Sequence, residues 1–119
     1  MVSINPTGDQ FKQLMALPYE GPIVMVNLLK FKEGGVESYA RYEEVSLKSV
    51  QGVGGRLIYR GNYLMPVIGD DDWDEVIIVE YPSIAAFIEM QRNKEYQAAV
   101  HFRTDALVDS RLYLTKSSE

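Results

Sequence analysis

The spacing of apolar residues near the N-terminus predicts a short helix. Thr7 and Gln10 stand three residues apart, as in a capping box, where each side chain bonds the other residue's backbone N–H. Apolar residues then recur at helical spacing until Pro18, which cannot continue a helix; they are Phe11, Leu14 and Met15. The predicted helix therefore lies between Thr7 and Pro18.

The next apolar segment shows no alternation. Residues 22–32, PIVMVNLLKFK, are apolar at nearly every position, which is typical of a strand covered on both faces. Gly34 and Gly35 end this strand, and a helical arc of apolar residues continues up to the glycines of 52–55. We predict a crossover helix whose apolar arc consists of Val36, Tyr39, Ala40, Leu47 and Val50.

The second half of the chain adds a hairpin before more helix. Residues 56–69 and 74–81 are rich in β-branched and aromatic residues and are joined through the turn-like GDDDW, so they predict an antiparallel hairpin. Pro66 places the first of these strands at a sheet edge. The remaining pattern predicts a helix capped by Ser83, a second helical stretch from Lys94 to about Ala106, and a strand near residues 108–115.

Apart from the N-terminal helix, the predicted order is βαββαβ. This is the order of the ferredoxin-like α+β fold, in which both helices cover one face of a four-stranded antiparallel sheet. Because the strands are apolar on both sides, the bare face should also be buried, and a second copy of the chain is the simplest cover. We expect a homodimer through this sheet face, and a single domain at 1–119 with a helical extension at 1–20 and a core at 21–116.

Composition and charge narrow the possible partners. The 119 residues carry a net charge of −5 and no cysteine. An acidic surface repels phosphate backbones, so nucleic acid is not an expected partner. The lack of cysteine excludes disulfides and thiolate chemistry and fits a cytoplasmic location. The N-terminus lacks the pattern of a secretion signal, and no apolar run approaches the roughly 20 residues that span a bilayer, so we expect no membrane partner.

Several motifs, taken in order, resemble those of one bacterial family. They are MVNLLKF, VGGRLIYRG, DDWDEVIIVEYPS, EYQAAVHFRT and DSRL. From Gly21 to Leu112 the chain is similar to the domain-of-unknown-function family 1330, a branch of the dimeric α+β barrel proteins. The resemblance implies that fold but no activity, since other branches resemble cofactor-free monooxygenases, lactone isomerases and haem-dependent enzymes. Phe102 stands where many members would have a second histidine, which argues against a reaction that needs paired imidazoles.

Asn27 is the polar exception in the first predicted strand. It shares a strand face with Met25 and Leu29, so its amide should be desolvated and in need of partners. Two interpretations stay open at this position. The amide either bonds to nearby backbone or faces a ligand.

Charged residues alternate along the two strands of the predicted hairpin. Arg56, Arg60 and Asn62 share one face of the first strand, and Glu80 alternates with apolar residues on the second. If the hairpin turns about Asp70, Arg60 lies directly opposite Glu80. This pair is either a structural salt bridge, which we favour, or part of a ligand-binding site.

His101 is the only histidine, and its unperturbed pKa lies near neutrality. On a helix, Asp105 lies one turn later and can orient the imidazole, which predicts a general base with its carboxylate. The alternative is a surface histidine with an incidental neighbour. Arg103 is close in sequence and is a further candidate for ligand binding, whereas haem ligation by His101 alone is a weaker hypothesis.

Two further residues of the crossover helix have ambiguous positions. Tyr39 is expected in the core or in a pocket wall, because a phenol with a pKa near ~10 is a poor acid at neutral pH. Glu43 falls inside the apolar arc, so it is either buried with a partner or the helix is rotated; we favour rotation. One histidine, no cysteine and scattered carboxylates predict no metal site, and we expect no cofactor.

The sequence thus predicts a pocket and leaves its reaction open. The leading hypothesis is a cofactor-free enzyme acting on a small, partly apolar organic molecule. The alternative is a non-catalytic dimeric binding or structural module, in which the same polar residues hold the fold. The candidate ligand-binding residues are Asn27, Arg60, Glu80, Arg103 and Tyr39, and the candidate catalytic residues are His101 and Asp105.

Overall fold

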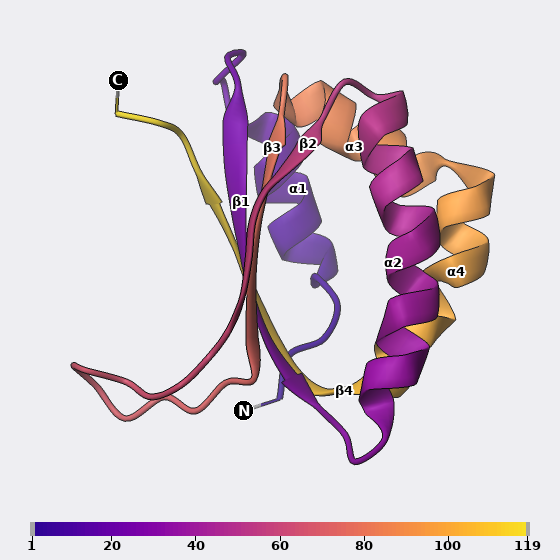
Figure 1. Cartoon of the computed structure of the whole chain (residues 1–119). Coiled ribbons are helices and arrows are strands. Elements are labelled where there is room, and N and C mark those ends of the chain that lie inside the picture. The colour runs from indigo at the N-terminus through magenta and orange to yellow at the C-terminus, as the bar shows by residue number, and fades with distance from the viewer. Residues whose placement is uncertain (1, 119) are drawn as a thin grey trace.

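The computed structural model describes residues 2–118 and confirms the predicted order of strands and helices (Figure 1). Met1 and Glu119, the ends of the predicted domain, lie outside the described residues. The elements are α1 (Gly8–Ala16), β1 (Ile23–Phe31), α2 (Gly35–Gly52), β2 (Arg56–Asn62), β3 (Glu75–Tyr81), α3 (Ile84–Arg92), α4 (Lys94–Ala106) and β4 (Leu107–Thr115).

The helix starts follow the predicted capping chemistry. Thr7 and Gln10 form both hydrogen bonds of the capping box at the start of α1. Ser83 accepts a hydrogen bond from the backbone of Ala86 at the start of α3. The second helical stretch, α4, begins at Lys94 as predicted, because Asn93 ends α3 and caps α4 through its side chain. These polar side chains satisfy N–H groups that a helix leaves unpaired at its start.

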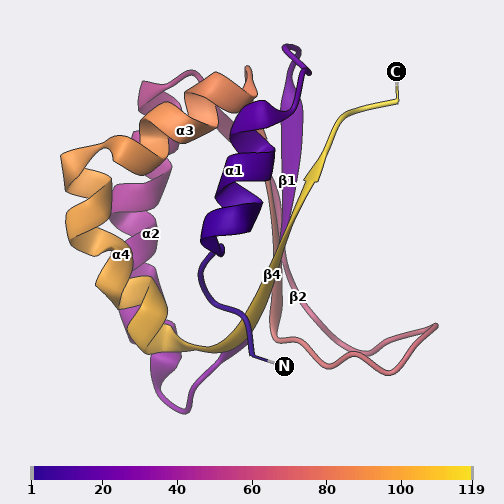
Figure 2. The same ribbon diagram turned by 180° about the vertical axis from the view of Figure 1, so that it is seen from behind.

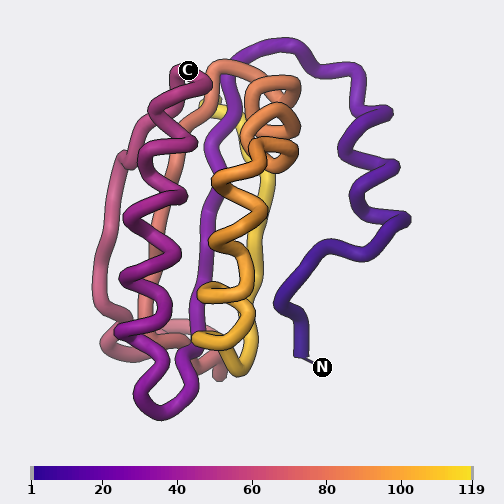
Figure 3. Tube along the Cα trace, turned by 90° about the vertical axis from the view of Figure 1, so that its right-hand side faces the viewer, coloured from indigo at the N-terminus to yellow at the C-terminus, as the bar shows by residue number. Residues whose placement is uncertain are grey.

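The four strands form one antiparallel sheet in the order β2-β3-β1-β4. All the helices lie on one side of this sheet, and the other side carries none (Figures 1 and 2). Helices α2 and α4 run side by side over the sheet (Figure 3). This arrangement is the ferredoxin-like α+β fold that the sequence predicts.

The core lies between the sheet and the helices. Along β1 and β3 the buried side chains stand at alternate positions that face the helices, as the pleat of a strand requires; they are Ile23, Met25 and Leu29 of β1 and Ile77, Val79 and Tyr81 of β3. The largest fully buried side chains are Ile23, Leu29, Val50 and Leu107. Within residues 2–118, no helix combines the length and the apolar character needed to cross a membrane.

Helix α2 is rotated relative to its predicted apolar arc, as the position of Glu43 led us to favour. Val36 and Ala40 are exposed. The buried residues of the helix are Gly35, Tyr39, Tyr42 and Val50. The rotation places Glu43 at the margin of the buried face and no longer at its middle.

The predicted register of the hairpin is wrong. Arg56, and not Arg60, lies opposite Glu80, and their side chains form an ion pair with 2.9 Å between Nε and Oε1. Arg60 pairs instead with Ile77. A bulge between Leu57 and Tyr59 shifts the strand by one residue, so Arg56 and Arg60 point to opposite faces of the sheet.

The first strand of the hairpin is also shorter than predicted. β2 is an edge strand, as Pro66 indicated, but it ends at Asn62, and residues 63–74 leave the sheet as a projecting connection. The backbone N–H of Tyr63 donates to the carbonyl oxygen of Asp74. The centre of the hairpin therefore lies between Ile68 and Gly69, and not at Asp70. Gly69 has a φ of 94°, a backbone conformation that favours glycine.

Candidate functional site

Two polar side chains lie on the helix-facing side of the sheet, in one row that crosses three neighbouring strands. Arg60 of β2 pairs with Ile77 of β3, and Ile77 pairs with Asn27 of β1. Side chains in one cross-strand row point to the same face, so Arg60 and Asn27 share the helix-facing side, about 10 Å apart across two strand spacings. Two of the predicted site residues therefore face the same layer.

Arg60 is held between two carboxylates that come from neighbouring elements. Its Nη2 lies 2.6 Å from Oε2 of Glu43 in α2, and its Nε lies 3.6 Å from Oε1 of Glu75 in β3. The side chains of Glu43 and Glu75 are 18% and 16% exposed, whereas that of Arg60 is 42% exposed. We call these three residues the Arg60 cluster. Its arginine can reach a ligand from the solvent side, while its carboxylates are largely shielded.

The electrostatics of the Arg60 cluster favour a proton on one carboxyl group. Burial raises the pKa of Glu75 above its ordinary value, and the negative charge of Glu43 raises it further, while Arg60 acts in the opposite direction. The buried Oε2 of Glu43 accepts no hydrogen bond from residues 2–118, so its contact with Arg60 is an ion pair without hydrogen-bond geometry. The cluster thus combines a carboxyl group whose pKa is raised with a buried carboxylate oxygen that accepts no hydrogen bond within residues 2–118.

Asn27 makes the backbone contact that its structural interpretation predicts. Its Nδ2 donates to the carbonyl oxygen of Ile77 at 3.4 Å, and the side chain is partly buried. This hydrogen bond is long, and a carboxamide has further donor and acceptor capacity. A contact of Asn27 with a ligand stays a prediction.

A wall of aromatic rings closes the interior beside the Arg60 cluster. The ring centroid of Tyr39 lies 5.3 Å from those of Phe31 and Tyr42, and Tyr42 lies 5.8 Å from Tyr96. The hydroxyl groups of Tyr42 and Tyr96 share a hydrogen bond of 2.8 Å. Burial raises the pKa of both Tyr39 and Tyr42. These phenols therefore stay protonated at neutral pH and form a wall.

Arg103 ties the N-terminal segment to the body of the fold. Its Nη1 donates to the carbonyl oxygen of Ile4 at 2.5 Å, and its Nη2 donates to the hydroxyl of Ser110 at 3.4 Å. The same hydroxyl donates to the carbonyl oxygen of Ser3 at 2.7 Å. These bonds give Arg103 a structural task, and its predicted contact with a ligand stays a prediction.

His101 and Asp105 lie on the exposed side of α4. Both side chains are exposed, and no hydrogen bond or ion pair joins them in the part of the chain that the structure describes. This is the arrangement that the surface-histidine alternative predicts. Glu80 also lies away from the Arg60 cluster, because it forms an ion pair with Arg56 on the opposite face of the sheet. The structure therefore does not bring these three residues together with Arg60.

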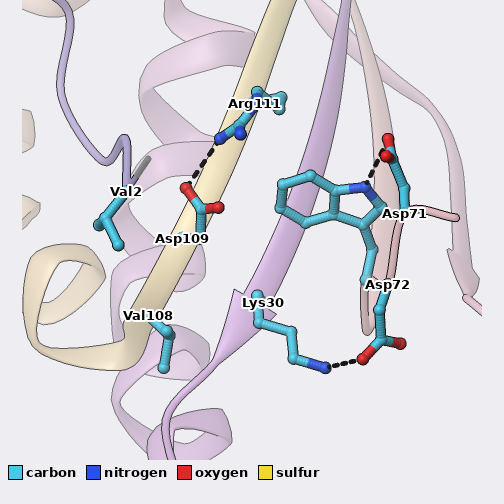
Figure 4. A pocket seen from close by; sticks show the side chains of 8 residues that line it. Val2, Lys30, Asp71, Asp72, Val108, Asp109 and Arg111 are labelled. Carbon is cyan, nitrogen blue, oxygen red and sulfur yellow. Dashed lines mark hydrogen bonds and ion pairs between the residues drawn. The ribbon is translucent and has the colours of Figure 1, made fainter.

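A hollow of about 290 Å³ lies on the face of the sheet away from the helices (Figure 4). Its charged groups form ion pairs with one another. Nζ of Lys30 lies 2.8 Å from Oδ2 of Asp72, and Nη1 of Arg111 lies 2.8 Å from Oδ1 of Asp109. The guanidinium carbon of Arg111 also lies 5.2 Å from the ring centroid of Trp73. Because these partners satisfy each other, the hollow offers a ligand less free polar capacity than the Arg60 cluster. Its lining is completed by Val2, Asp71 and Val108.

Among residues 2–118, no group of three histidine or carboxylate side chains is placed to hold a metal ion. Glu75 is the member of the Arg60 cluster that the sequence analysis missed. It begins β3 and shares a strand face with Ile77 and Val79, so a carboxylate at the start of an apolar face was the available signal. Glu43 gave a similar signal within its helix, but the bulge in β2 concealed that Arg60 faces both carboxylates.

Comparisons with known proteins identify the family and agree on the fold. The model of DUF1330, a domain of unknown function, matches residues 28–116. A protein of unknown function from Rhodopseudomonas palustris is 38% identical, with 100% of this chain and 99% of that chain covered and a TM-score of 0.93. No match was found among curated proteins.

More distant solved structures share the fold alone. A dimeric protein of unknown function with a ferredoxin-like fold from Bacteroides fragilis is 14% identical, with 83% of this chain and 100% of that chain covered and a TM-score of 0.59. A NIPSNAP-like domain protein from Burkholderia xenovorans is 18% identical, with 85% and 89% covered and a TM-score of 0.55.

Proposed function

This chain belongs to the DUF1330 family, whose description states no function, and we propose one from the geometry of the Arg60 cluster. The chain binds a small, partly apolar organic molecule on the helix-facing side of β2 and transfers a proton there without a cofactor. The observation that carries this proposal is a pair of largely buried carboxylates that share one half-exposed arginine. Such an arrangement places a carboxyl group with a raised pKa beside a cationic anchor.

Each member of the cluster has a distinct task in this proposal. Arg60 offers planar N–H donors to a carbonyl or carboxylate oxygen of the ligand. Glu75, whose pKa is raised, exchanges a proton with the ligand. Glu43 keeps Arg60 in place by charge. Leu57, which is 36% exposed on the same sheet face, supplies apolar surface.

The reaction class that fits these tasks is proton transfer at a carbon next to a carbonyl group. The ionised carboxylate of Glu75 takes the proton from carbon, and the electron pair moves onto the carbonyl oxygen. Arg60 stabilises the negative charge that develops on that oxygen. Return of the proton to the same or a neighbouring atom completes an exchange or an isomerisation.

The protein acts as a homodimer through the helix-free face of the sheet. This face carries a central apolar patch of partly buried side chains, with Tyr59 and Tyr113 more than half exposed beside it; the patch consists of Val24, Val26, Leu28, Val76 and Ile78. A monomer seldom leaves a wide apolar face in water. The dimeric state described for the Bacteroides fragilis protein of the same fold supports this part of the proposal.

The test is a thermal-shift screen of small carbonyl and carboxylate compounds, followed by exchange in D2O. We expect some compounds to raise the melting temperature of the wild type and of Arg56→Met, but not of Arg60→Met. Deuterium should enter those compounds next to the carbonyl group, as seen by NMR, and Glu75→Gln should abolish this exchange. Equal stabilisation of the two arginine variants would contradict the proposed site.

A non-catalytic binding module is the second candidate, because both carboxylates already engage Arg60. The same experiment separates the two functions. Stabilisation that depends on Arg60 without deuterium exchange in any bound compound favours the binding module.

A further inference from the structure

The connection between β2 and β3 is an arm with an apolar tip. Residues 63–74, which we call the arm, leave the sheet on the side opposite to the helices (Figures 1 and 2). Near its turn four large apolar side chains are exposed to solvent; they are Leu64 at 93%, Met65 at 66%, Val67 at 89% and Ile68 at 95%. Loop tips are usually polar, so four neighbouring apolar side chains indicate a surface that something covers.

The base of the arm is fixed to the sheet. The backbone N–H of Tyr63 donates to the carbonyl oxygen of Asp74 at 2.9 Å. The backbone N–H of Asp74 in turn donates to the carbonyl oxygen of Leu29 at 2.8 Å. The hydroxyl of Tyr63 donates to the carbonyl oxygen of Asp71 at 2.8 Å, and Trp73 is only 7% exposed. These contacts aim the arm away from its own chain, so its tip cannot fold back onto its own core without breaking them.

We propose that the arm of each copy reaches past the sheet of a second copy and buries its apolar tip against that copy. The arm leaves on the side where the partner would lie, and each limb of about five residues extends to roughly 17 Å at about 3.3 Å per residue. Two sheets that pack face to face are separated by about 10 Å. The arm is therefore longer than the gap between the sheets, and its tip meets the partner beyond the plane of the partner's sheet.

The area of the sheet face alone is small for a stable dimer. Four strands about 4.8 Å apart and seven residues long cover roughly 440 Å² per copy, or about 900 Å² in total. Standard stable interfaces bury about 1,200–2,000 Å². Four apolar tip side chains from each arm add roughly 800 Å² at about 100 Å² each. With both arms the interface reaches the standard range, which favours a second copy as the occupant.

This inference rests on the homodimer in the proposed function, and the experiment separates the two. Sedimentation across a dilution series compares the wild type with two variants. The arm variant carries three substitutions together, Leu64→Ser, Val67→Ser and Ile68→Ser. The sheet-face variant carries Ile78→Lys. The three arm positions are solvent-exposed in the single chain, so circular dichroism should show an unchanged fold. We expect the dimer dissociation constant of the arm variant to rise at least 100-fold.

A fluorophore on Ile68→Cys gives a second readout, because the chain has no other cysteine. Its emission should shift to the red when the wild-type dimer is diluted into monomers. An arm variant that dimerises like the wild type, together with emission that does not change on dilution, would overturn the arm inference and leave the dimer standing. A wild type that is monomeric throughout would overturn both.

Discussion

Glu75 should make the stability of the protein depend on pH. Its raised pKa means that the folded chain binds this proton more tightly than the unfolded chain does. The resulting stabilisation is fully present below the ordinary pKa of a glutamate and is lost as the pH rises through the raised pKa. Above that raised pKa, an ionised Glu75 therefore costs stability.

The substitution Glu75→Gln tests this sign directly, because the amide stays neutral at every pH. We expect the melting temperature of the variant to exceed that of the wild type by about 2–4 °C at pH 7.5, and the difference to disappear near pH 4. Calorimetry at several pH values measures both. Glu80→Gln on the opposite face is the matched control and should show no such pH-dependent gain. A difference that grows toward acidic pH would contradict the account.

The two arginines of β2 provide a matched pair on opposite faces. Arg60→Met leaves Glu43 and Glu75 near each other without a cation, which should lower the free energy of unfolding by about 1–2 kcal/mol at pH 7. Arg56→Met removes an exposed ion pair with Glu80 and should change the free energy of unfolding by no more than about 0.5 kcal/mol. Urea unfolding measures both values. Equal losses for the two variants would show that Arg60 does not separate two interacting carboxylates.

The sequence predicted the sheet face of some candidate site residues and not of others, for a physical reason. Asn27 and Arg60 lie on the helix-facing side, but Glu80 does not, and Glu75 was missed. Strand parity fixes faces only while the register is regular, and one bulged residue near Ile58 reverses the face of every residue before it. A bulge has no strong sequence signal, so the partners of Arg60 required the structure.

Among the elements, α2 owes its position to a close approach at its first residue. A Cβ on Gly35 would collide with the carbonyl oxygen of Ala106, and that oxygen already accepts a hydrogen bond from the N–H of Lys32 at 2.8 Å. Gly35→Ala should therefore lower the free energy of unfolding by about 2–3 kcal/mol. Gly52, at the other end of the same helix, has no neighbour within reach of an added Cβ.

Gly52→Ala is the control for this prediction. It should be neutral or stabilising by up to about 1 kcal/mol, since alanine favours the helix. Chemical unfolding of both variants measures the difference. If Gly35→Ala were as stable as Gly52→Ala, the contact between the start of α2 and Ala106 would not control the position of the helix.

The order of elements could be predicted because its signals are local. Capping at Thr7 and Ser83, glycines after β1 and an unbroken apolar strand each depend on neighbouring residues. The rotation of α2 and the early end of β2 depend on distant contacts instead. The approach of Gly35 to Ala106 and the projection of the arm are therefore visible only in three dimensions.

The whole molecule is expected to unfold as a dimer. If folding and association are coupled, mass action requires the melting temperature to rise with protein concentration. Scans at concentrations that span about 100-fold measure this shift. A midpoint that is independent of concentration, with a light-scattering mass near 13.5 kDa, would contradict both the dimer and the assignment of the bare sheet face.

In the proposed function, the Arg60 cluster holds the ligand. The most direct test is a crystal structure of the protein with a compound that raises its melting temperature. We expect density for an oxygen of that compound within hydrogen-bond distance of Arg60, on the helix-facing side of β2 and beside Glu75. A compound that sits elsewhere, for example in the hollow beside Trp73, and leaves the Arg60 cluster without contact would contradict it.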